Sequence, residues 1–516
     1  MSPAPDVDVA LVGLGPVGAG AAVLLGHAGL RVAAFERAPD IYDLPRAVGL
    51  DGEIIRAFQR IGLGREVEGV TQPHRDGDAV WFTNSKRQAL FGAEFLPHGV
   101  NGWRDIAFFD QPELEALLRD LAGRYPGVAL HTGHEVLDLA EDTPGVTLSV
   151  RDLATGNERD VTARYVIGCD GASSFVRKRL GISWHSLGYD QDWLVVDITQ
   201  TPEARLPTHT MQVCDPARIT TYVHTKDPYR RWEFRLLPGE TREDMARPER
   251  VHELLASWLP PEHYALRRAV VYQFHAATAA RWRTGNVFLA GDAAHQTPPF
   301  LGQGMNAGLR DVINLSWKLP LVLDGTTERA LLDTYAAERD GHARDLVEWA
   351  VAIGQLMETL AAAEAAGEGQ APTGEHVSAG YGQGRTVPPL RGGVVVEEQV
   401  GDGNATGHLF RQPTVRTAAG VDVMLDELLG PGFAAVGRTD ADLAMSDASQ
   451  RTFARLGGRT VSLADIETRL GKVDALFDAH AAAIVRPDRY VFGVTDAHLS
   501  LDDLMARLST SLQLSA

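Results

Sequence analysis

Residues 7–36, VDVALVGLGPVGAGAAVLLGHAGLRVAAFE, decide the fold of the first part of this chain. The apolar run Val7–Val12 predicts a strand, and the Ala- and Leu-rich run that ends near Ala28 predicts a helix. Residues 31–35 predict a second strand. A strand, a helix and a strand within about 30 residues are typical of a βαβ unit, so we expect a parallel sheet with helices on its faces.

The connection between the first strand and the helix has the pattern GxGxxG. The first glycine permits a tight turn, the second lets the backbone approach a pyrophosphate, and the third brings helix and strand together. N–H groups at the start of the helix favour phosphate, and Glu36 can accept hydrogen bonds from both hydroxyls of a ribose. The segment predicts a dinucleotide site; a glycine-rich turn without a ligand is the alternative, and the pattern leaves NAD and FAD open. The candidate nucleotide-binding residues are Gly13, Gly15, Pro16, Val17, Gly18, Glu36 and Arg37.

The composition indicates a folded protein of several domains, because 44% of its 516 residues are hydrophobic and 23% are charged. A net charge of −19 disfavours nucleic acid and anionic membranes as partners. No signal peptide is visible and no apolar run approaches the roughly 20 residues of a membrane-spanning helix, so we expect a cytoplasmic protein. Two cysteines, Cys169 and Cys214, exclude a disulfide framework, a four-cysteine zinc site and a CxxC pair, and we expect no metal site.

Further segments carry a resemblance to a known family. Residues 286–295, NVFLAGDAAH, contain a short strand and the turn after it, and residues 302–306, GQGMN, begin a helix. Residues 168–177, GCDGASSFVR, follow another strand. Together with the first motif, they resemble the single-component FAD-dependent aromatic hydroxylases, the p-hydroxybenzoate hydroxylase family. The resemblance extends to residues 45–49, PRAVG, and to residues 332–339, LDTYAAER.

The resemblance implies a non-covalently bound FAD. It assigns Asp292 to the ribityl chain, the N–H groups of the 302–306 turn to the flavin ring, and Asp170 to FAD and nicotinamide binding. Arg46 matches a residue beside the pyrophosphate, and Gln111 matches a polar contact of the flavin. The chemistry of the residues agrees, because a carboxylate at a strand end suits a polyol and a helix amino terminus suits the charge of a reduced flavin. The residues implied for FAD in these segments are Arg46, Gln111, Asp170, Asp292, Pro299, Gly302, Gly304, Met305 and Asn306.

Within that family, residues 43–51, 192–197 and 214–216 are similar to 3-(3-hydroxyphenyl)propionate hydroxylases, and polyketide-tailoring hydroxylases share most of the same motifs. The resemblance implies that NADH or NADPH reduces FAD, which reacts with O2 to give a C4a-hydroperoxide that hydroxylates a phenol. Epoxidation, Baeyer–Villiger insertion or oxidative decarboxylation of a larger natural-product aromatic compound is an alternative use of the same flavin chemistry. A protein that only binds FAD and an aromatic ligand is a further alternative.

The β-rich section 187–280 is expected to supply the substrate contacts. Tyr222 and His224 share one face of a strand near 219–224, and Trp232 and Phe234 share one face of the next, because side chains alternate along a strand. Either Tyr222 or His224 could polarise or deprotonate a phenol, with simple packing as the alternative for each. We also take Pro298 as a candidate substrate contact. Arg231 or Arg235 could hold a substrate carboxylate, with an ordinary salt bridge as the alternative.

The expected architecture is α/β plus α+β. A Rossmann-like FAD-binding domain (1–75, 105–186 and 281–365) is interleaved with a β-sheet substrate domain (76–104 and 187–280). Residues 366–395 are rich in Ala, Gly and Pro and predict a linker or crossover. Residues 396–516 resemble the thioredoxin-like domain of phenol hydroxylases, but no cysteine follows Cys214, so this domain cannot do dithiol chemistry. We expect it to serve packing or contacts in a homodimer or higher homo-oligomer.

Overall fold

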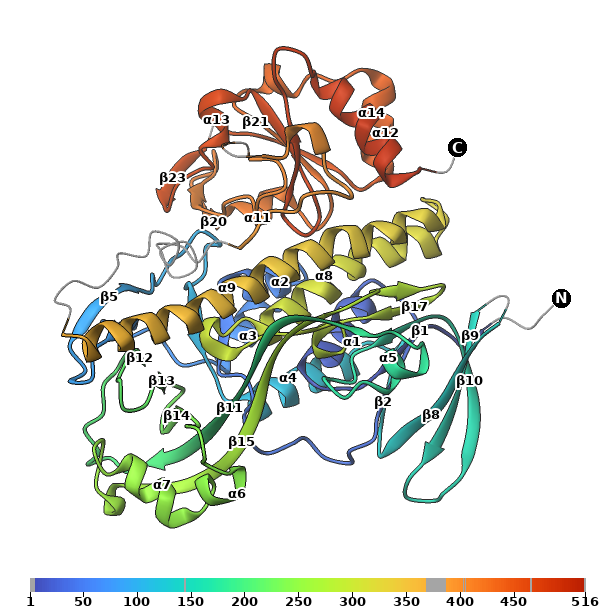
Figure 1. Ribbon diagram of the computed structural model, residues 1–516. Coiled ribbons are helices and arrows are strands. Elements are labelled where there is room, and N and C mark those ends of the chain that lie inside the picture. Colours follow the sequence, from blue (N-terminus) through green and yellow to red (C-terminus); the bar gives the residue numbers. More distant parts are fainter. Residues whose placement is uncertain are drawn as a thin grey trace.

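The computed structural model describes residues 5–142, 145–367, 387–401, 403, 405–464 and 466–514. Most of the expected linker, 366–395, lies outside these residues. Two large sheets and a carboxy-terminal unit make up the described fold, and the long helix α9 (Thr334–Ala365) runs between that unit and the rest (Figure 1). The mixed α/β architecture expected from the sequence is confirmed.

The first sheet is built around the βαβ unit. Its central strands run parallel in the order β17-β10-β1-β2-β7, and β16 and the β8–β9 hairpin extend it with antiparallel pairings. Helix α1 (Pro16–His27) packs against α4 (Gln111–Gly123) and α8 (Gly304–Leu323). The strands are β1 (Val7–Val12), β2 (Val32–Glu36), β7 (Val128–Thr132), β8 (His134–Asp142), β9 (Gly145–Asp152), β10 (Glu158–Gly168), β16 (Arg283–Thr284) and β17 (Val287–Leu289).

The second sheet has eight strands in the order β18-β15-β11-β14-β13-β12-β4-β5. Two of them, β11 and β15, span 17 and 16 residues and reach back toward the first sheet (Figure 1). Helices α6 (Arg242–Met245) and α7 (Pro248–Leu255) lie beside this sheet, and α7 buries Val251 and Leu255 in the core on one of its faces. The strands are β4 (Ala79–Thr83), β5 (Ala89–Glu94), β11 (Trp184–Gln200), β12 (Thr210–Val213), β13 (Thr220–His224), β14 (Tyr229–Arg235), β15 (Tyr264–Ala279) and β18 (His295–Gln296).

Shorter elements connect the two sheets. Strands β3 and β6 pair with each other and form a separate two-stranded antiparallel sheet. These elements are β3 (Gly49–Asp51), α2 (Gly52–Gln59), α3 (Gly64–Gly69), β6 (Ile106–Phe108), α5 (Phe175–Arg179) and the short 3₁₀ turn η3 (Pro299–Leu301).

The stretch Arg329–Ala365, which includes α9, is long and apolar enough to cross a membrane by length and composition. In the fold it packs against α8, β15 and η3. It also carries Glu338 and Arg339, two charged residues that are about 1% exposed and form buried ion pairs. These contacts are those of a helix in the core of a folded protein.

The carboxy-terminal unit is built on a four-stranded sheet in the order β22-β21-β24-β25. Strand β21 (Ala434–Gly437) is parallel to β22 (Arg459–Ser462), and β24 (Ala482–Val485) is antiparallel to β21 and to β25 (Val491–Val494). Helix α12 connects β21 to β22, and α14 follows β25. The remaining elements are β19 (Thr414–Arg416), β20 (Asp422–Met424), α11 (Leu425–Leu429), α12 (Asp447–Arg455), β23 (Glu467–Leu470), α13 (Leu476–Ala479) and α14 (Leu501–Leu512).

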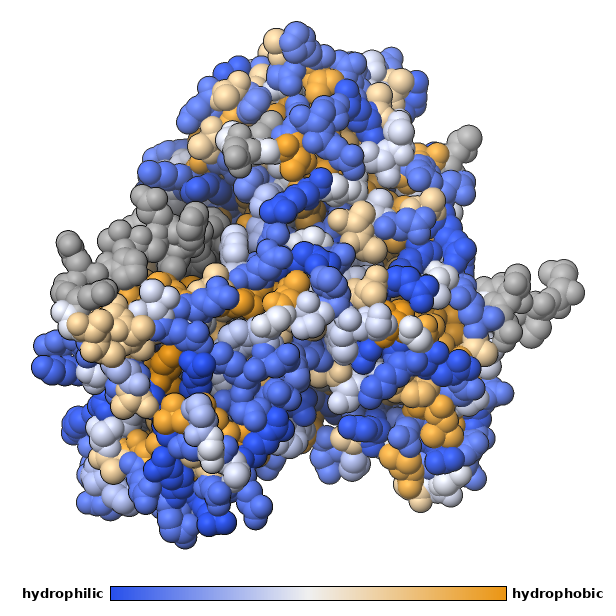
Figure 2. Space-filling model, in the orientation of Figure 1, coloured by the Kyte–Doolittle hydropathy of each residue, from blue (hydrophilic) through white to orange (hydrophobic). Residues whose placement is uncertain are grey.

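Hydrophilic side chains cover most of the face seen in Figure 2, on this unit as on the two sheets. The contact between the carboxy-terminal unit and the helices below it combines apolar packing, such as Phe433 against Trp317 of α8, with buried charges. The guanidinium of Arg486 lies 2.7 Å from the carboxylates of Glu338 and Asp488, and all three side chains are at most 2% exposed. Burial raises the pKa of Glu338, but Arg486 and Lys318 outweigh it and lower that pKa to about 2.

A second buried ion pair lies at the same contact. Asp426 of α11 accepts hydrogen bonds from Arg56 of α2 and from Arg489, at 2.7 to 2.9 Å. Burial raises the pKa of Asp426, and the two guanidinium groups outweigh that effect and lower it. Because each carboxylate is paired, the carboxy-terminal unit docks in one position on α2, α8 and α9.

We expect Arg486→Ala to lower the free energy of unfolding by about 3–5 kcal/mol, because it leaves buried carboxylates without their main partner. Urea unfolding followed by circular dichroism measures this. Arg507→Ala is the matched control, because Arg507 pairs with Glu398 at an exposed position of the same unit and should cost at most about 1 kcal/mol. Equal effects of the two substitutions would contradict the assignment of the docking energy to the buried cluster.

Candidate functional site

A cavity of about 380 Å³ lies between the two large sheets, and its lining residues come from both. What we call the nucleotide half is lined by Gly15, Pro16, Val17, Arg46, Ala47, Val48, Gly49, Gln111, Cys169, Gly171, Ala290, Gly291, Asp292, Thr297, Pro299, Phe300, Leu301, Gly302, Gly304 and Met305. What we call the sheet half comes from β6 and the second sheet and is lined by Val80, Phe95, Ile106, Phe108, Thr210, Gln212, Thr221, Val223, Arg231, Glu233 and Phe274.

Parallel strands gather the nucleotide half. In the pairing of β1, β10 and β17, Val12 lies opposite Gly168, and Gly168 lies opposite Leu289. The turns that follow these strands therefore meet at one edge of the sheet, where ligands of open α/β sheets bind. This pairing brings the first glycine motif, residues 168–177 and the Gly291-Asp292 pair together.

The backbone geometry at Gly13 and Gly18 agrees with the tight turn and the close helix–strand approach that the sequence predicted. Gly13 has a φ of 95°, and a Cβ there would lie 2.6 Å from the carbonyl oxygen of Cys169. A Cβ at Gly18 would lie 2.1 Å from the carbonyl oxygen of Gly13. A Cβ at Gly15 would meet no atom within 4 Å, because this residue faces the open cavity. Gly15 thus starts α1 where a phosphate can approach the backbone, and no side chain caps the helix there.

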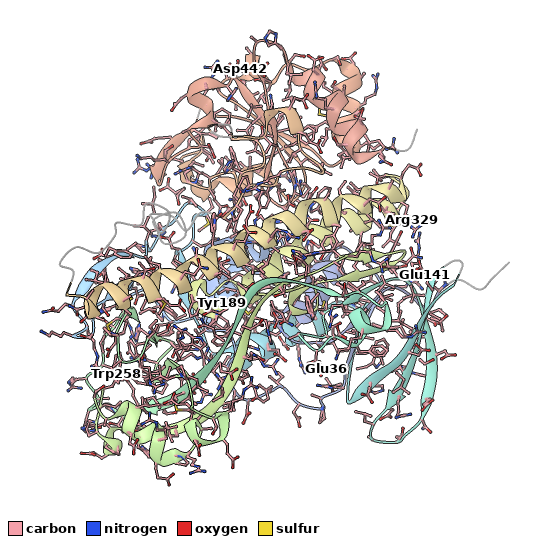
Figure 3. All side chains as sticks on the ribbon, viewed as in Figure 1. Glu36, Glu141, Tyr189, Trp258, Arg329 and Asp442 are labelled. Atoms are coloured by element: carbon pink, nitrogen blue, oxygen red, sulfur yellow. The ribbon has the colours of Figure 1, made fainter. Side chains whose placement is uncertain are left out.

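Glu36 ends β2 next to this motif, as Figure 3 shows. Its carboxylate accepts hydrogen bonds from the backbone N–H groups of Leu14 and Ala38, each at 2.9 Å. Each oxygen keeps a free lone pair, so the carboxylate can still accept from ribose hydroxyls. Arg37 is exposed, and neither residue lines the cavity.

The 302–306 turn is held rigidly from behind. Gly302 has a φ of 63°, and Gly304 and Met305 face the cavity at the start of α8, which has no side-chain cap. The Asn306 side chain is fully buried, accepts from the N–H of Asp51 at 3.0 Å and donates to the carbonyl groups of Gly49 and Gly302. Asn306 therefore positions the turn. The N–H of Gly302 donates to the carbonyl of Pro299, so the backbone that faces the cavity at the start of α8 is that of Gly304 and Met305.

The loop that bears Arg46 is also fixed in place. The Gln111 side chain is buried and accepts hydrogen bonds from the backbone N–H groups of Arg46 and Ala47, at 3.0 and 2.8 Å. Arg231 donates to the carbonyl groups of Pro45 and Arg46. The Arg46 side chain is exposed along the cavity, where it can reach a pyrophosphate.

The two carboxylates implied for FAD differ in their surroundings. Asp292 is open to the cavity, and the protein packed around it raises the pKa of its carboxyl. Asp170 accepts hydrogen bonds from the Ser174 hydroxyl at 2.6 Å and from the N–H of Val176 at 3.0 Å, and it does not line the cavity. Asp170 thus holds the turn into α5, and its neighbour Gly171 faces the cavity.

The sheet half presents other residues than the sequence interpretation chose. Tyr222, Trp232 and Phe234 lie in the hydrophobic core on the opposite face of the second sheet. The Tyr222 hydroxyl donates to the carbonyl of Pro207 at 2.8 Å, and its ring stacks on Trp258, which Figure 3 shows beside α7. The structure does not bring these three residues to the cavity, and Pro298 is buried beside it without lining it.

His224 is also unsuited to act as a base. It is fully buried, and its Nε2 atom lies 2.9 Å from the guanidinium of Arg75, which can only donate. Burial, followed by the charges of Arg230 and Arg75, lowers its pKa to about 3. The imidazole is therefore neutral at physiological pH, and the nitrogen that could take a proton is occupied.

The neighbouring positions on the same strands reach the cavity instead. Thr221 and Val223 of β13, and Arg231 and Glu233 of β14, line the sheet half. Arg231 is 3% exposed and pairs with Asp197 at 2.7 Å. For Arg231 and Glu233, the sequence signal was a strand in which four of the seven residues are charged and the other three are aromatic. Arg235, the other cation considered, pairs with Glu358.

We expect Gly15→Val to give a folded protein without FAD. A Cβ at this position meets no protein atom within 4 Å, and the valine side chain would fill the space at the start of α1 where the pyrophosphate would lie. Flavin absorbance and circular dichroism of the purified protein measure the two properties. Gly18→Val is the contrasting variant, because its Cβ would collide with Gly13, and it should lose folded protein as well. Full FAD content in Gly15→Val would contradict the nucleotide site.

We expect Tyr222→Phe to keep the activity of the enzyme within about twofold. It removes a hydrogen bond to Pro207 on the far face of the sheet, which is worth about 1 kcal/mol of stability. Steady-state kinetics and thermal unfolding check both effects. A large loss of kcat with unchanged FAD content would contradict this prediction and indicate that Tyr222 takes part in the reaction.

Known proteins are similar to this chain over nearly its whole length. The family model described as "FAD binding domain" matches residues 6–350, and the one described as "HcaD C-terminal domain" matches residues 407–511. A 3-(3-hydroxy-phenyl)propionate/3-hydroxycinnamic acid hydroxylase of Burkholderia cenocepacia is 36% identical, covering 95% of this chain and 94% of that protein. A probable NADH-specific resorcinol 4-hydroxylase of Rhodococcus jostii is 35% identical, covering 95% and 92%.

Among solved structures, the ternary complex of aklavinone-11 hydroxylase with FAD and aklavinone superimposes with a TM-score of 0.82 at 26% identity, covering 99% of both chains. The features of the nucleotide half fit FAD independently of these names: two uncapped helix termini, an open glycine and an exposed carboxylate face one cavity. The chain therefore belongs to the FAD-binding family of FAD-dependent aromatic hydroxylases.

Proposed function

We propose that this enzyme hydroxylates an uncharged phenol, using bound FAD, NADH or NADPH, and O2. The observation that supports this most directly is the continuity of the nucleotide half with a largely apolar sheet half in one cavity. An aromatic ring held by the sheet half would lie next to a flavin held by the nucleotide half. FAD, once bound and reduced by the nicotinamide, supplies the chemistry that activates O2 and delivers one oxygen atom to the ring.

The chain's own residues bind, orient and exclude water. On this proposal, α1 and Arg46 hold the pyrophosphate, Asp292 accepts from the ribityl hydroxyls, and the start of α8 faces the ring of the flavin. Aromatic and aliphatic side chains of the sheet half surround the substrate ring and keep water away from it. These apolar residues are Val80, Phe95, Ile106, Phe108, Val223 and Phe274.

The charges of the sheet half favour a substrate without a carboxylate. Arg231 is the cation that lines this half among the described residues, and its guanidinium already pairs with Asp197 and donates to two backbone carbonyl groups. Asp197 also pairs with Arg268. A substrate carboxylate would have to displace these bonds and lie near Glu233, which repels it when ionised. We therefore favour a phenol like the resorcinol named for the Rhodococcus relative over an arylpropionate.

Two features of the whole protein belong to the same proposal. The carboxy-terminal sheet has one parallel and two antiparallel pairings with helices α12 and α14, which supports a thioredoxin-like fold. The chain has no cysteine after Cys214, so this unit serves packing or contact between subunits in a homo-oligomer. We place the enzyme in the cytoplasm, where the reduced nicotinamide that it consumes is available.

Epoxidation, Baeyer–Villiger or decarboxylative oxidation of a larger aromatic compound would use the same nucleotide half. The size of the sheet half does not distinguish these reactions from hydroxylation, but the mass and structure of the product do. A protein that binds FAD and an aromatic ligand without reaction would oxidise NADH at one rate whatever ligand is added.

We expect NADH or NADPH oxidation by the purified protein to accelerate at least tenfold with resorcinol, and less with 3-(3-hydroxyphenyl)propionate. Mass spectrometry should find a product heavier by one oxygen atom. The panel includes a hydroxylated polycyclic quinone as a large phenol. Faster turnover with the arylpropionate would overturn the uncharged substrate, and no acceleration by any phenol would overturn hydroxylation.

A further inference from the structure

Glu233 is the unexplained group of the cavity. It lies in the middle of β14, is 4% exposed, and lines the sheet half. Within the part of the chain that the structure describes, its carboxylate makes no hydrogen bond and no ion pair within 4 Å. A carboxylate this buried normally has a partner in the protein, so an unpartnered one that faces a cavity indicates a partner among the ligands.

The cations nearest to Glu233 are engaged elsewhere. Arg231, two residues away on the same strand, donates to Asp197 and to the carbonyl groups of Pro45 and Arg46. Arg268 of β15 pairs with Asp197 and donates to Pro45. The two guanidinium groups therefore fix the loop that holds Arg46 and neutralise Asp197, and they leave the Glu233 carboxylate free.

Strand register places Glu233 in a polar row that crosses the sheet. It lies opposite Val195 of β11 on one side and Thr221 of β13 on the other, and Thr221 lies opposite Gln212 of β12. The Thr221 hydroxyl donates to the Gln212 amide oxygen at 2.6 Å. The donor of Thr221 is thus used, and neither Thr221 nor Gln212 can take a proton at physiological pH. Of the two carboxylates that line the cavity, Asp292 belongs to the nucleotide half and Glu233 to the sheet half.

We propose that Glu233 is the catalytic base that takes the proton from the hydroxyl group of the bound phenol. This inference rests on the hydroxylase function proposed above. In the step, the phenolic O–H bond breaks, its electron pair stays on oxygen, and the proton moves to a carboxylate oxygen of Glu233. The resulting phenolate ring is the better nucleophile toward the oxygen atom to be transferred. Glu233 then returns the proton to the oxygen of the product, so the proton transfer itself needs no further acid or base.

The electrostatic surroundings suit this role. Burial raises the pKa of Glu233 to about 7, Arg231 and Arg268 oppose that rise, and Asp197 adds to it. Across the cavity, Arg46 and Asp292 carry the charges that face it from the nucleotide half. A base is most effective when its pKa lies near the working pH. Because only the ionised carboxylate can accept a proton, kcat/KM should rise as the pH increases through about 7.

The test compares Glu233→Gln with the wild-type holoenzyme, using the phenol that accelerates NADH oxidation most in the panel above. Glutamine keeps the shape and cannot accept the proton, so we expect kcat to fall by about 10²- to 10⁴-fold with unchanged FAD content. The rise of kcat/KM near pH 7 should disappear. Two control variants are Glu94→Gln, at an exposed position of β5, and Thr221→Val, which removes a neighbouring hydroxyl and should keep the rise near pH 7.

A second measurement does not depend on a substrate. Difference infrared spectroscopy of the holoenzyme should show a protonated carboxylic acid that ionises near pH 7 and is missing in Glu233→Gln. Activity of Glu233→Gln within threefold of wild type, with the same pH profile, would overturn the proposal. If no phenol is turned over, the hydroxylase function fails, and the infrared signal then decides separately whether Glu233 titrates as proposed; its absence would overturn the proposal.

Discussion

The parallel pairing of β1, β10 and β17 is the constraint on which the site depends. It brings three turns that are far apart in the sequence to one edge of a sheet, and a glycine (Gly13, Gly168 or Gly291) lies within two residues of the end of each strand. Gly15 and Asp292 line one cavity because these strands share register. The second sheet supports this edge as well, because Arg231 of β14 and Arg268 of β15 donate to the backbone of the loop that bears Arg46.

In the second sheet, side chains point alternately to the two faces, and this alternation decides which residues reach the cavity. One face of β13 and β14 packs into a core with Tyr222 and Trp232, and the other face lines the cavity with Thr221 and Glu233. Buried arginines beneath the cavity are bound to Asp197 and to backbone carbonyl groups, so they hold a loop in place and are not free to bind a ligand. The polar row and the apolar walls together form the sheet half of the cavity, which we propose as the site of a phenol.

The sequence predicted the strand–turn–helix of the first motif because its signals are local. A glycine pattern between a strand and a helix favours one geometry, and Gly13 and Gly18 have the tight turn and the close approach that this geometry requires. The contacts that support the site could not be predicted from the sequence, because Asn306 and Gln111 accept hydrogen bonds from backbone N–H groups that are 64 or more residues away in the chain.

The residues of the sheet half could not be predicted from the sequence in the same way. Strands β13 and β14 are buried on both faces, so hydrophobic alternation does not show which face lines a cavity. Choosing the aromatic residues selected the face that packs under α7.

The most direct test of this account is a crystal structure of the holoenzyme with a phenol bound. We predict FAD along the starts of α1 and α8, with the hydroxyl group of the phenol within hydrogen-bond distance of the Glu233 carboxylate. A phenol bound on the Tyr222 and Trp232 face of the sheet, or one whose hydroxyl group points away from Glu233, would contradict it.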